Sequence, residues 1–391
     1  MTADGAAEQL TGPVRRVRTP IGDPAWQVDG YREIKELLTD PRLGRSHPQP
    51  EQAARYSESA FLGRPSGTDP ENERAEHARF RRVLSRSFSA RRMEALRPRV
   101  TELASGLLDE LAKQVPPVDF HERVAFPLPV LVICELLGVP YQDREEFCAY
   151  SEQLADMTDQ ATSKAGMQGL FTYMTALVER KRGQPGVDVI SDLILAQQTE
   201  TFPADGIAGT AAGLLFAGHI TTVNVIDRGV LLLCADAGQR AALAADPGLA
   251  GRAVEEILRM PTPRPGTSDP GTSRTVPVGL TRYAHADIDV GGVTIAAGEL
   301  VLLNPRAANC DPEVFADPDR FDIARTDNPH LTFGHGAHFC PGAPLARIEL
   351  QALFEMLPAR FPTLRLAVPV EELRTKTNLI FGGLTELPVT W

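Results

Sequence analysis

A short glycine-rich segment near the end of the chain holds the residues best suited to chemistry. It runs from residue 333 to residue 342, reads Phe-Gly-His-Gly-Ala-His-Phe-Cys-Pro-Gly, and contains His335, His338 and Cys340. Glycines let a backbone approach a bulky ligand closely. The apolar segment from Ala343 to Leu350 follows. Cys340 would therefore lie at the start of a helix, where free amides and the helix dipole favour a thiolate over a thiol.

A single thiolate at this place could serve a zinc ion, a catalytic nucleophile or a haem iron. Zinc takes four ligands, usually from closely spaced pairs, and no second cluster follows this one. A nucleophilic cysteine needs a base and an orienting group, which the spacing does not show. Haem iron needs one strong protein ligand on one face, and cysteine is one of its ligands. The plain alternative is a glycine-rich turn around a buried cysteine.

The segment also matches a longer pattern, Phe333-x-x-Gly336-x-His338-x-Cys340-x-Gly342. This pattern resembles the haem-ligand loop of the cytochrome P450 family, in its soluble bacterial branch, and the resemblance extends from about Val14 to Trp391. It implies a mainly α-helical fold with small β-sheets, in which a long central helix lies over the haem beside a minor β-rich region. We expect a flexible N-terminal tail over residues 1–13 and a single P450 domain over residues 14–391.

The resemblance implies a cofactor, haem b, and a set of residues that hold it. Cys340 would be the axial ligand of the iron, and Phe333 would shield its thiolate from water. His77 and Arg81 lie four residues apart, on one helix face, and match the pair that binds haem propionates in this family. The other positions that the resemblance assigns to the cofactor are Arg282, His338 and Gly342. Dioxygen would be the co-substrate, and electrons would come from NAD(P)H through a ferredoxin and its reductase.

Pro341 departs from the residue that usually follows the cysteine in the family, which is Leu or Ile. Proline has no N–H, and amide hydrogen bonds temper the electron donation of a metal-bound thiolate. We therefore expect a more electron-rich thiolate and a lower reduction potential.

A second motif lies on a long helix predicted from Pro203 to about Ala235. It reads Ala-Gly-His-Ile-Thr-Thr over residues 217–222. Threonines inside helices often bond their own helix carbonyls, but the motif also resembles the oxygen-activation segment of the family, which implies catalytic roles for Thr221 and its neighbour Thr222. Ile220 stands where the family usually has an acid, so protons would need water, His219 or a group on the substrate.

Other stretches bear on the substrate. The resemblance places a substrate cavity beside five residues: Leu214, Ala217, Gly218, Val278 and Ile380. The apolar turn at Leu379–Phe381 would reach the same cavity, and a proline-rich loop over residues 261–277 would either shape it or be disordered. Four further apolar residues would belong either to a mobile lid or to the core: Met157, Met167, Phe171 and Met174.

Two groups of charged residues complete the resemblance. Glu256 and Arg259 are three residues apart and, with Arg320, resemble a buried structural ion triad of the family. The segment from Arg74 to Arg99 has helical periodicity and is strongly basic. Such a run is usually a solvated helix face, but it could also dock an acidic ferredoxin. The arginines expected on that face are Arg79, Arg82, Arg86, Arg91 and Arg92.

Composition indicates which partners and which cellular location to expect. The chain has 391 residues and a formal net charge of −11, which disfavours nucleic acid as a partner. Its five cysteines are odd in number and scattered, as expected in a reducing cytoplasm. No uninterrupted apolar run is long enough to cross a bilayer. We expect a cytoplasmic monomer with a small-molecule substrate and no membrane contact.

The remaining elements can be predicted only coarsely. A hairpin is expected over residues 14–17 and 26–28, a helix over 31–40, a long loop over 46–72, and almost continuous helix over 93–200. Short strands are expected at three places: 288–290, 293–295 and 300–303.

Taken together, the resemblance implies a haem-thiolate monooxygenase that hydroxylates or epoxidises a secondary metabolite, such as a polyketide, a macrolide or a peptide-derived natural product. The ending Glu386–Trp391 is similar to that of members acting in antibiotic biosynthesis. Oxidative coupling, desaturation or rearrangement without oxygen insertion is the alternative that Ile220 indicates. A haem-based sensor is a remote alternative, because it would normally need an output domain. Fold alone does not fix the substrate.

Overall fold

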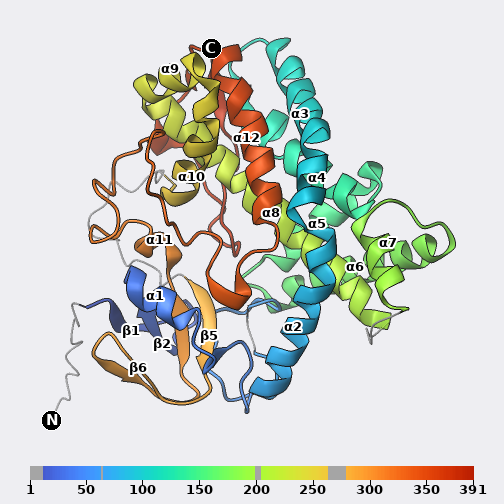
Figure 1. Cartoon of the computed structure of the whole chain (residues 1–391), viewed down its shortest axis with the longest axis vertical. Helices are drawn as coiled ribbons and strands as arrows, with labels where there is room; N and C mark the ends of the chain where they lie inside the picture. The colour runs from blue at the N-terminus through green and yellow to red at the C-terminus, as the bar shows by residue number, and fades with distance from the viewer. Residues whose placement is uncertain (1–11, 63–64, 199–203, 263–278) are drawn as a thin grey trace.

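The computed structural model describes residues 12–62, 65–198, 204–262 and 279–391. The first helices are α1 (Tyr31–Leu37), α2 (Pro70–Ser87), α3 (Ala90–Ala112), α4 (Pro127–Leu137), α5 (Arg144–Leu154) and α6 (Gln160–Gly183). The later helices are α7 (Val189–Ala196), α8 (Ala204–Ala235), α9 (Ala237–Ala245), α10 (Ala250–Arg259), α11 (Pro305–Ala308) and α12 (Ala343–Arg360). Figure 1 shows a mainly helical molecule with a small β-rich region at one end, as the sequence predicts.

The strands form three small sheets, and those that contain β1 and β6 make up the β-rich region at one end of the molecule (Figure 1). The largest has the order β1-β2-β8-β5-β3, and the others are β4-β10-β9 and the hairpin β6-β7. Their bounds are β1 (Val14–Arg18), β2 (Pro24–Val28), β3 (Leu43–Gly44), β4 (Val118–Asp119), β5 (Leu280–Ala284), β6 (Ile288–Val290), β7 (Val293–Ile295), β8 (Leu300–Leu303), β9 (Arg365–Leu366) and β10 (Pro388–Thr390). The predicted strands over 288–290, 293–295 and 300–303 match β6, β7 and β8.

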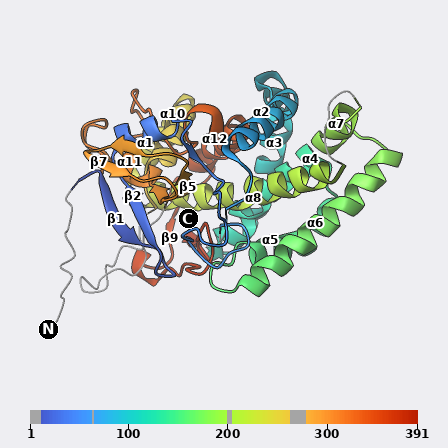
Figure 2. The ribbon, with the colours of Figure 1, turned by 90° about the horizontal axis from the view of Figure 1, so that it is seen from below.

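Helix α8 runs through the middle of the molecule (Figure 2) and packs against α4, α6 and α10. Its buried residues include Ile207, Leu215, Ile226 and Val230. One stretch of this helix, Gly206–Ala235, is long and apolar enough to cross a membrane, and half of its most apolar part is buried inside the protein. The core helix of a globular protein has the same length and hydropathy, so these two properties are weak evidence for a membrane segment.

The basic stretch predicted as one helix over residues 74–99 is two helices. The first, α2, already begins at Pro70, because the Asp69 carboxylate accepts hydrogen bonds from the amides of Glu71 and Asn72. It ends at Phe88, and extended backbone at Ser89 separates it from α3. The helical periodicity continues across this break, which is why the sequence pattern did not reveal it.

The C-terminal turn, residues 375–384, contacts the connection between α5 and α6. Residues 375–384 are closed by an antiparallel bridge between Thr375 and Leu384. The amide of Ile380 donates to the Ala155 carbonyl at 2.9 Å, just beyond the end of α5. The predicted apolar turn at Leu379–Phe381 therefore has its backbone bound to the α5–α6 connection.

Candidate active site

The loop that carries Cys340 is shaped by two glycines with positive φ, Gly334 at 73° and Gly336 at 67°. A Cβ at Gly336 would also lie 3.0 Å from the Leu38 carbonyl oxygen. The amide of Cys340 donates to the Phe333 carbonyl at 2.8 Å and closes the loop. These constraints fix the thiol immediately before α12, where the sequence analysis placed it.

Several groups around the Cys340 thiol favour a negative charge on sulfur. Burial raises the thiol pKa, whereas hydrogen bonds from the amides of Gly342 and Ala343 lower it. The positive charges of Arg81 and Arg347 act in the same direction as the amides. Because the residue between Cys340 and Gly342 is a proline, these two amides are the backbone donors that reach the sulfur.

Aromatic rings flank the loop. The Arg347 guanidinium lies over the Phe333 ring, 4.7 Å from its centroid. The rings of Phe333 and Phe339 meet edge to face at 6.2 Å. This packing holds Phe333 beside the loop, which agrees with its predicted shielding role. A hollow of about 230 Å³ lies between this loop and α2, lined by Arg81, Leu84, Ser85, Phe88, Phe339, Cys340, Pro341 and Pro344.

On another side of the loop the structure gathers imidazole and guanidinium groups. The rings of His77 and His338 stack with centroids 3.8 Å apart. Arg81 donates to the Phe339 carbonyl at 2.8 Å, and Arg282 is almost fully buried. The four predicted propionate-binding residues are thus brought to one place by α2, β5 and the Cys340 loop.

The electrostatics of this cluster are unusual because positive groups dominate it. Burial, together with the charge of Arg45, lowers the pKa of Arg282 to about 9. Burial and the nearby arginines lower the pKa of His338 to about 3, so this imidazole is neutral. Its Nδ1 atom is buried and has no partner among the described residues. A cluster of donors with so little negative charge suits an anion.

The second predicted motif lies on α8. The Thr221 hydroxyl donates to the Ala217 carbonyl at 2.9 Å, and the Thr222 hydroxyl donates to the Gly218 carbonyl at 3.3 Å. Both therefore bond their own helix, as threonines in helices commonly do. Thr221 remains partly exposed, whereas Thr222 is buried. Of the two, Thr221 is the one whose hydroxyl can meet a ligand.

His219 does not lie where a proton relay to Thr221 would need it. Its side chain is only 1 % exposed, and its Nδ1 donates to the Leu215 carbonyl at 2.7 Å. Its ring packs edge to face against Phe147 on α5, and burial lowers its pKa to about 4. Of the proton routes suggested for the Ile220 motif, the route through His219 is disfavoured, because this imidazole is neutral and directed into the core.

The predicted substrate residues fall into two groups. Ala217 is exposed, and Leu214 and Ile380 are partly exposed. Gly218 is also partly exposed, and a Cβ there would lie 2.7 Å from the Ile133 side chain of α4, so only a glycine fits this close contact; its place in the cavity wall stays a prediction. Val278 and most of the predicted loop over 261–277 lie outside the described residues.

An aromatic contact that the sequence analysis missed joins three distant segments. Phe61 packs against Phe216 of α8 with centroids 5.2 Å apart, and Phe216 packs against Phe381 at 5.7 Å. Phe216 is buried, whereas half of the Phe61 side chain is exposed. Nothing in the sequence indicates that a single aromatic residue in a long loop, such as Phe61, packs against a distant helix.

The four residues with a predicted choice between lid and core divide between surface and interior. Met174 is fully buried, so it belongs to the core, whereas Met167 and Phe171 on the same helix are exposed. Met157 is partly buried, and its amide donates to the Asn378 carbonyl at 2.9 Å.

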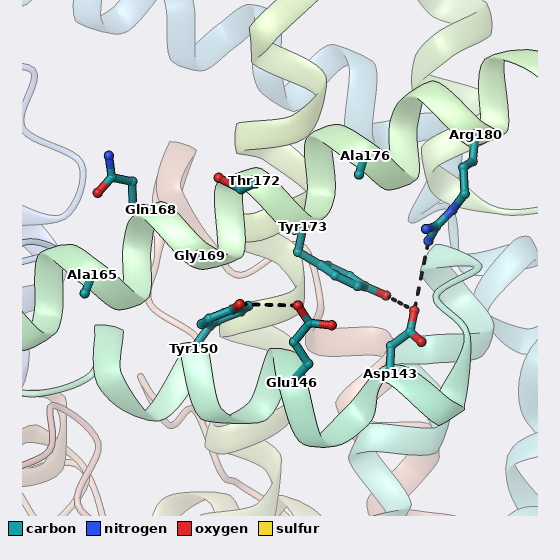
Figure 3. A pocket seen from close by; sticks show the side chains of 10 residues that line it. All are labelled: Asp143, Glu146, Tyr150, Ala165, Gln168, Gly169, Thr172, Tyr173, Ala176 and Arg180. Atoms are coloured by element: carbon teal, nitrogen blue, oxygen red, sulfur yellow. Dashed lines mark hydrogen bonds and ion pairs between the residues drawn. The ribbon is translucent and has the colours of Figure 1, made fainter.

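Figure 3 shows a separate groove of about 600 Å³, bordered by α5, α6 and the turn before α5. In it, the Tyr173 hydroxyl donates to Asp143 at 2.7 Å and the Tyr150 hydroxyl donates to Glu146 at 3.2 Å. None of the predicted site residues lines this groove.

Comparisons with known proteins decide the family. The family description "Cytochrome P450" matches residues 272–376. Pentalenolactone synthase of Streptomyces exfoliatus is 43 % identical over 98 % of this chain and 94 % of its own length. Mycinamicin IV hydroxylase/epoxidase of Micromonospora griseorubida is 40 % identical over the same shares. The substrate-free structure of PimD, a polyene macrolide pimaricin epoxidase, superposes with a TM-score of 0.84, at 45 % identity over 97 % of this chain and 93 % of that one.

The chain belongs to the cytochrome P450 family. It is a P450 monooxygenase with haem as its cofactor, dioxygen as co-substrate, and electrons from NAD(P)H delivered through redox partners. The expectation of a mainly helical P450 fold is confirmed. Its similarity to tailoring enzymes of natural-product pathways is confirmed as well.

The residues of this P450 fit the haem that the family requires. The unpaired Nδ1 of His338 and the buried guanidinium of Arg282 lie in a cluster where positive groups outnumber the one carboxylate that acts on them, Glu73, as a site for the two propionates needs. The Cys340 thiol accepts two amide hydrogen bonds, as a thiolate ligand needs. Among the described residues, no group of three His, Cys, Asp or Glu side chains could hold a metal ion by itself.

The predicted structural triad of this P450 needs one correction. Glu256 and Arg259 form two hydrogen bonds of 2.8 Å and are fully buried. The second arginine on Glu256 is Arg325, whose Nε lies 3.1 Å from Oε2. Arg320 is exposed, and its backbone carbonyl, not its guanidinium, accepts from Arg259. The sequence offered two arginines five residues apart, and only the fold shows which one turns inward.

The basic face also needs one correction. Arg92 is bound to Asp192 of α7, so it is not available to a partner. In the part of the chain that the structure describes, Arg79, Arg82, Arg86 and Arg91 are exposed and form no ion pair. Arg81, which precedes Arg82 on α2, lines the hollow beside Cys340.

Proposed function

We propose that this P450 inserts one oxygen atom into an apolar secondary metabolite of the polyketide, macrolide or peptide-derived class, by hydroxylation or epoxidation. The observation that carries the reaction type is the joint presence of a hydrogen-bonded Cys340 thiol and a partly exposed Thr221 on α8. The substrate class follows from the relatives, which include a mycinamicin hydroxylase/epoxidase and a pimaricin epoxidase. The rings of Phe61 and Phe381 support an apolar ligand.

The protein residues have separate roles in this proposal. Haem bound through Cys340 activates dioxygen for insertion into an organic substrate. The amides of Gly342 and Ala343 limit the charge that the thiolate donates. The cluster of His77, Arg81, Arg282 and His338 binds the propionates. The Thr221 hydroxyl, which donates to the Ala217 carbonyl in this structure, can instead donate its proton on the side of the site where dioxygen and substrate meet.

An optical titration of the ferric protein tests this proposal. A panel would set macrolides and linear polyketides against cyclic dipeptides and aromatic monomers. A macrolide that moves the haem from low to high spin, followed by a product one oxygen atom heavier, supports the proposal. A wild-type protein that folds with haem yet binds no member of the polyketide, macrolide or peptide-derived classes contradicts the substrate class. A folded protein that acquires no Soret band contradicts the role of Cys340.

A second reaction, oxidative coupling or rearrangement without oxygen insertion, is favoured by one observation. Ile220 cannot relay protons, and the neighbouring His219 is neutral and directed into the core. Protons must then come from water or from a group on the substrate, so the substrate itself can determine how the oxidation ends. Product mass and isotope content after turnover under ¹⁸O₂ separate the two reactions, because insertion leaves one labelled oxygen atom in the product and coupling leaves none.

We further propose that an acidic ferredoxin docks on the basic face formed by Arg79, Arg82, Arg86 and Arg91. Exposed arginines close to the Cys340 hollow support this choice. Replacing Arg82 and Arg86 by Gln should raise the ferredoxin concentration needed for half-maximal reduction several-fold at low salt, and the effect should fade at high salt. Reduction by dithionite, which needs no docking, is the control. Equal ferredoxin dependence of variant and wild type at low salt would place docking elsewhere.

We also propose a single domain over residues 14–391 that acts as a cytoplasmic monomer. The relatives are covered over 94 % of their length by this chain. The five cysteines are all free, which suits a reducing compartment.

A further inference from the structure

The propionate cluster contains a cation that the family resemblance did not assign. Arg45 follows β3, in the connection between the first sheet and α2. Its charge lowers the pKa of His77, His338 and Arg282 in addition to the effect of burial. Glu73, which accepts a hydrogen bond from the Arg45 amide, lies one helical turn before His77 on α2. The loop therefore places Arg45 beside the predicted propionate-binding groups.

The backbone of this loop is held rigidly. The Glu73 carboxylate accepts hydrogen bonds from the amide of Arg45 at 2.8 Å and from the amide of Ser46 at 3.0 Å. The Ser46 hydroxyl donates to the same carboxylate at 2.6 Å. Gly44 lies tightly against the same group, because a Cβ there would be 2.2 Å from the His285 ring and 2.8 Å from Glu73. Moving Arg45 away from the propionate cluster would therefore require breaking these hydrogen bonds.

The Arg45 side chain itself lacks an anionic partner. Among the described residues it forms no ion pair, and Glu73 is the one carboxylate whose charge acts on it. Its side chain retains solvent contact, although enough protein surrounds it for burial to lower its pKa. Holding a guanidinium beside Arg282 without a counter-ion is unfavourable. This arrangement is explained if a ligand anion completes it.

The groups in this region favour an anion. Arg45, Arg81 and Arg282 bring three guanidinium groups, and Glu73 is the carboxylate whose charge acts on Arg45. The His338 Nδ1 atom adds a buried polar group that has no partner among the described residues. Removing Arg45 would take one of the three guanidinium groups from the cluster.

We propose that Arg45 is a haem-binding residue that supplies the charge and donors for one propionate, and that Glu73 fixes the loop that presents it. The inference rests on the placement of the propionates beside His77 and Arg282. Loss of a positive charge beside the haem stabilises the more positive ferric state relative to the ferrous state. Loss of a guanidinium fork also weakens the hold on a carboxylate.

The test is redox potentiometry of the haem-loaded protein, with haem transfer to apomyoglobin as a second readout. For Arg45→Gln we expect the ferric-to-ferrous ratio at a fixed potential to rise about tenfold, which is about 59 mV for a one-electron couple. Haem transfer should be about tenfold faster. Arg45→Lys should recover the potential but only part of the retention of haem.

The matched control is Arg42→Gln, which removes the same charge three residues earlier, before β3. Arg42 is bound to Asp40 at 2.6 Å instead of facing the cluster, so both readouts should stay at the wild-type value.

If Arg45→Gln binds haem with unchanged potential and transfer rate while Arg282→Gln changes them, the inference is overturned. If neither variant changes them, the placement of the propionates is wrong as well. If Arg45→Gln does not fold, Arg45→Lys decides, since a wild-type transfer rate for that variant overturns the role of the fork.

Discussion

At the scale of single residues, Pro341 limits how many backbone amides reach the Cys340 sulfur. The donors present are the amides of Gly342 and Ala343. An amide hydrogen bond stabilises the thiolate more strongly when the sulfur carries more negative charge. The ferrous state, which leaves more charge on sulfur, therefore loses more than the ferric state when a donor is missing. The expected consequence is a low reduction potential in this protein.

Pro341→Leu should restore a donor and raise the reduction potential by some tens of millivolts, on the order of one hydrogen bond to a charged acceptor. Spectroelectrochemical titration of the substrate-free protein measures this change. Pro344→Ala is the control, because Pro344 lines the same hollow but lies beyond the two amides that bond the sulfur. A Pro341→Leu protein with the wild-type potential would show that the third amide has no influence on the iron.

Residues in the contiguous motif could be identified from the sequence, and residues brought in from elsewhere could not. The spacing of Cys340 and His338 indicated the family, which the relatives confirm. Arg45 was missed because it stands in a polar loop, where arginine is common. The prediction of Arg320 was wrong because Arg325, five residues later in the same irregular segment, is the arginine that reaches Glu256. Side-chain direction in an irregular segment depends on the packing of the whole fold, which a local pattern does not contain.

At the scale of elements, the contact between α10 and the irregular segment before the Cys340 loop depends on Glu256. Its carboxylate holds Arg259, Arg325, the Asn328 amide and the backbone amide of Asp322. A buried carboxylate with this many donors is well compensated, and removal of one donor leaves part of the charge unpaired.

Arg325→Ala should lower the free energy of unfolding by about 3 kcal/mol, as expected when one partner of a buried ion pair is removed. Urea unfolding followed by circular dichroism, with the Soret band as a second probe, measures the loss. Arg320→Ala should cost less than about 0.5 kcal/mol, because its exposed guanidinium can be removed without touching Glu256. A larger loss for Arg320→Ala than for Arg325→Ala would reverse the assignment.

A second link between elements is the contact between α8 and the short helical segment His121–Ala125. His121 and the buried Asp227 form an ion pair of 2.7 Å. Although burial lowers it, the Asp227 carboxylate raises the pKa of His121 above its usual value. The stabilisation from this pair is therefore complete below the unfolded pKa of about 6.5. It is lost as the pH rises through the folded pKa.

Asp227→Asn should destabilise the protein by about 2 kcal/mol at pH 6 and by clearly less at pH 9. Unfolding free energies of variant and wild type across this range give the comparison. Asp236→Asn is a control for the loss of one carboxylate, since Asp236 caps α9 and faces no histidine in the described structure. A loss for Asp227→Asn that stays constant with pH would mean that His121 carries no charge in the pair.

The helices and strands followed from local patterns where those patterns were strong. Short apolar runs indicated β6, β7 and β8, alternating in the first two and continuous in β8, and apolar periodicity indicated α8. The boundary between α2 and α3 was missed, because a cap at Ser89 interrupts the backbone without interrupting the side-chain period. Such breaks are set by the turn that α3 must make to pack against α12, the helix it contacts most.

At the scale of the whole molecule, the walls around α8 come from segments that are far apart in the sequence. The loop before α2 contributes Phe61, α8 contributes Phe216, and the C-terminal turn contributes Phe381. Backbone hydrogen bonds link the loop and the C-terminal turn through Met157, since the Glu58 amide donates to the Met157 carbonyl and the Met157 amide donates to the Asn378 carbonyl. The Asn224 side chain of α8 donates to the Phe381 carbonyl. No local pattern predicts such a contact, because each partner is an ordinary apolar residue in its own segment.

This arrangement makes Phe61 the aromatic residue of the three with most surface left for a ligand, since half of its side chain is exposed. Phe61→Ala should weaken binding of an apolar substrate about tenfold, which corresponds to the loss of roughly 1.4 kcal/mol of aromatic contact. The dissociation constant comes from the spin-state titration, and the Soret position without substrate should not change. Phe171→Ala is the matched control, because Phe171 is similarly exposed but lies on α6 outside this contact. Equal affinities of the Phe61→Ala and Phe171→Ala proteins would show that the substrate does not reach the aromatic wall, and that Ala217 and the Thr221 side of α8 alone hold it.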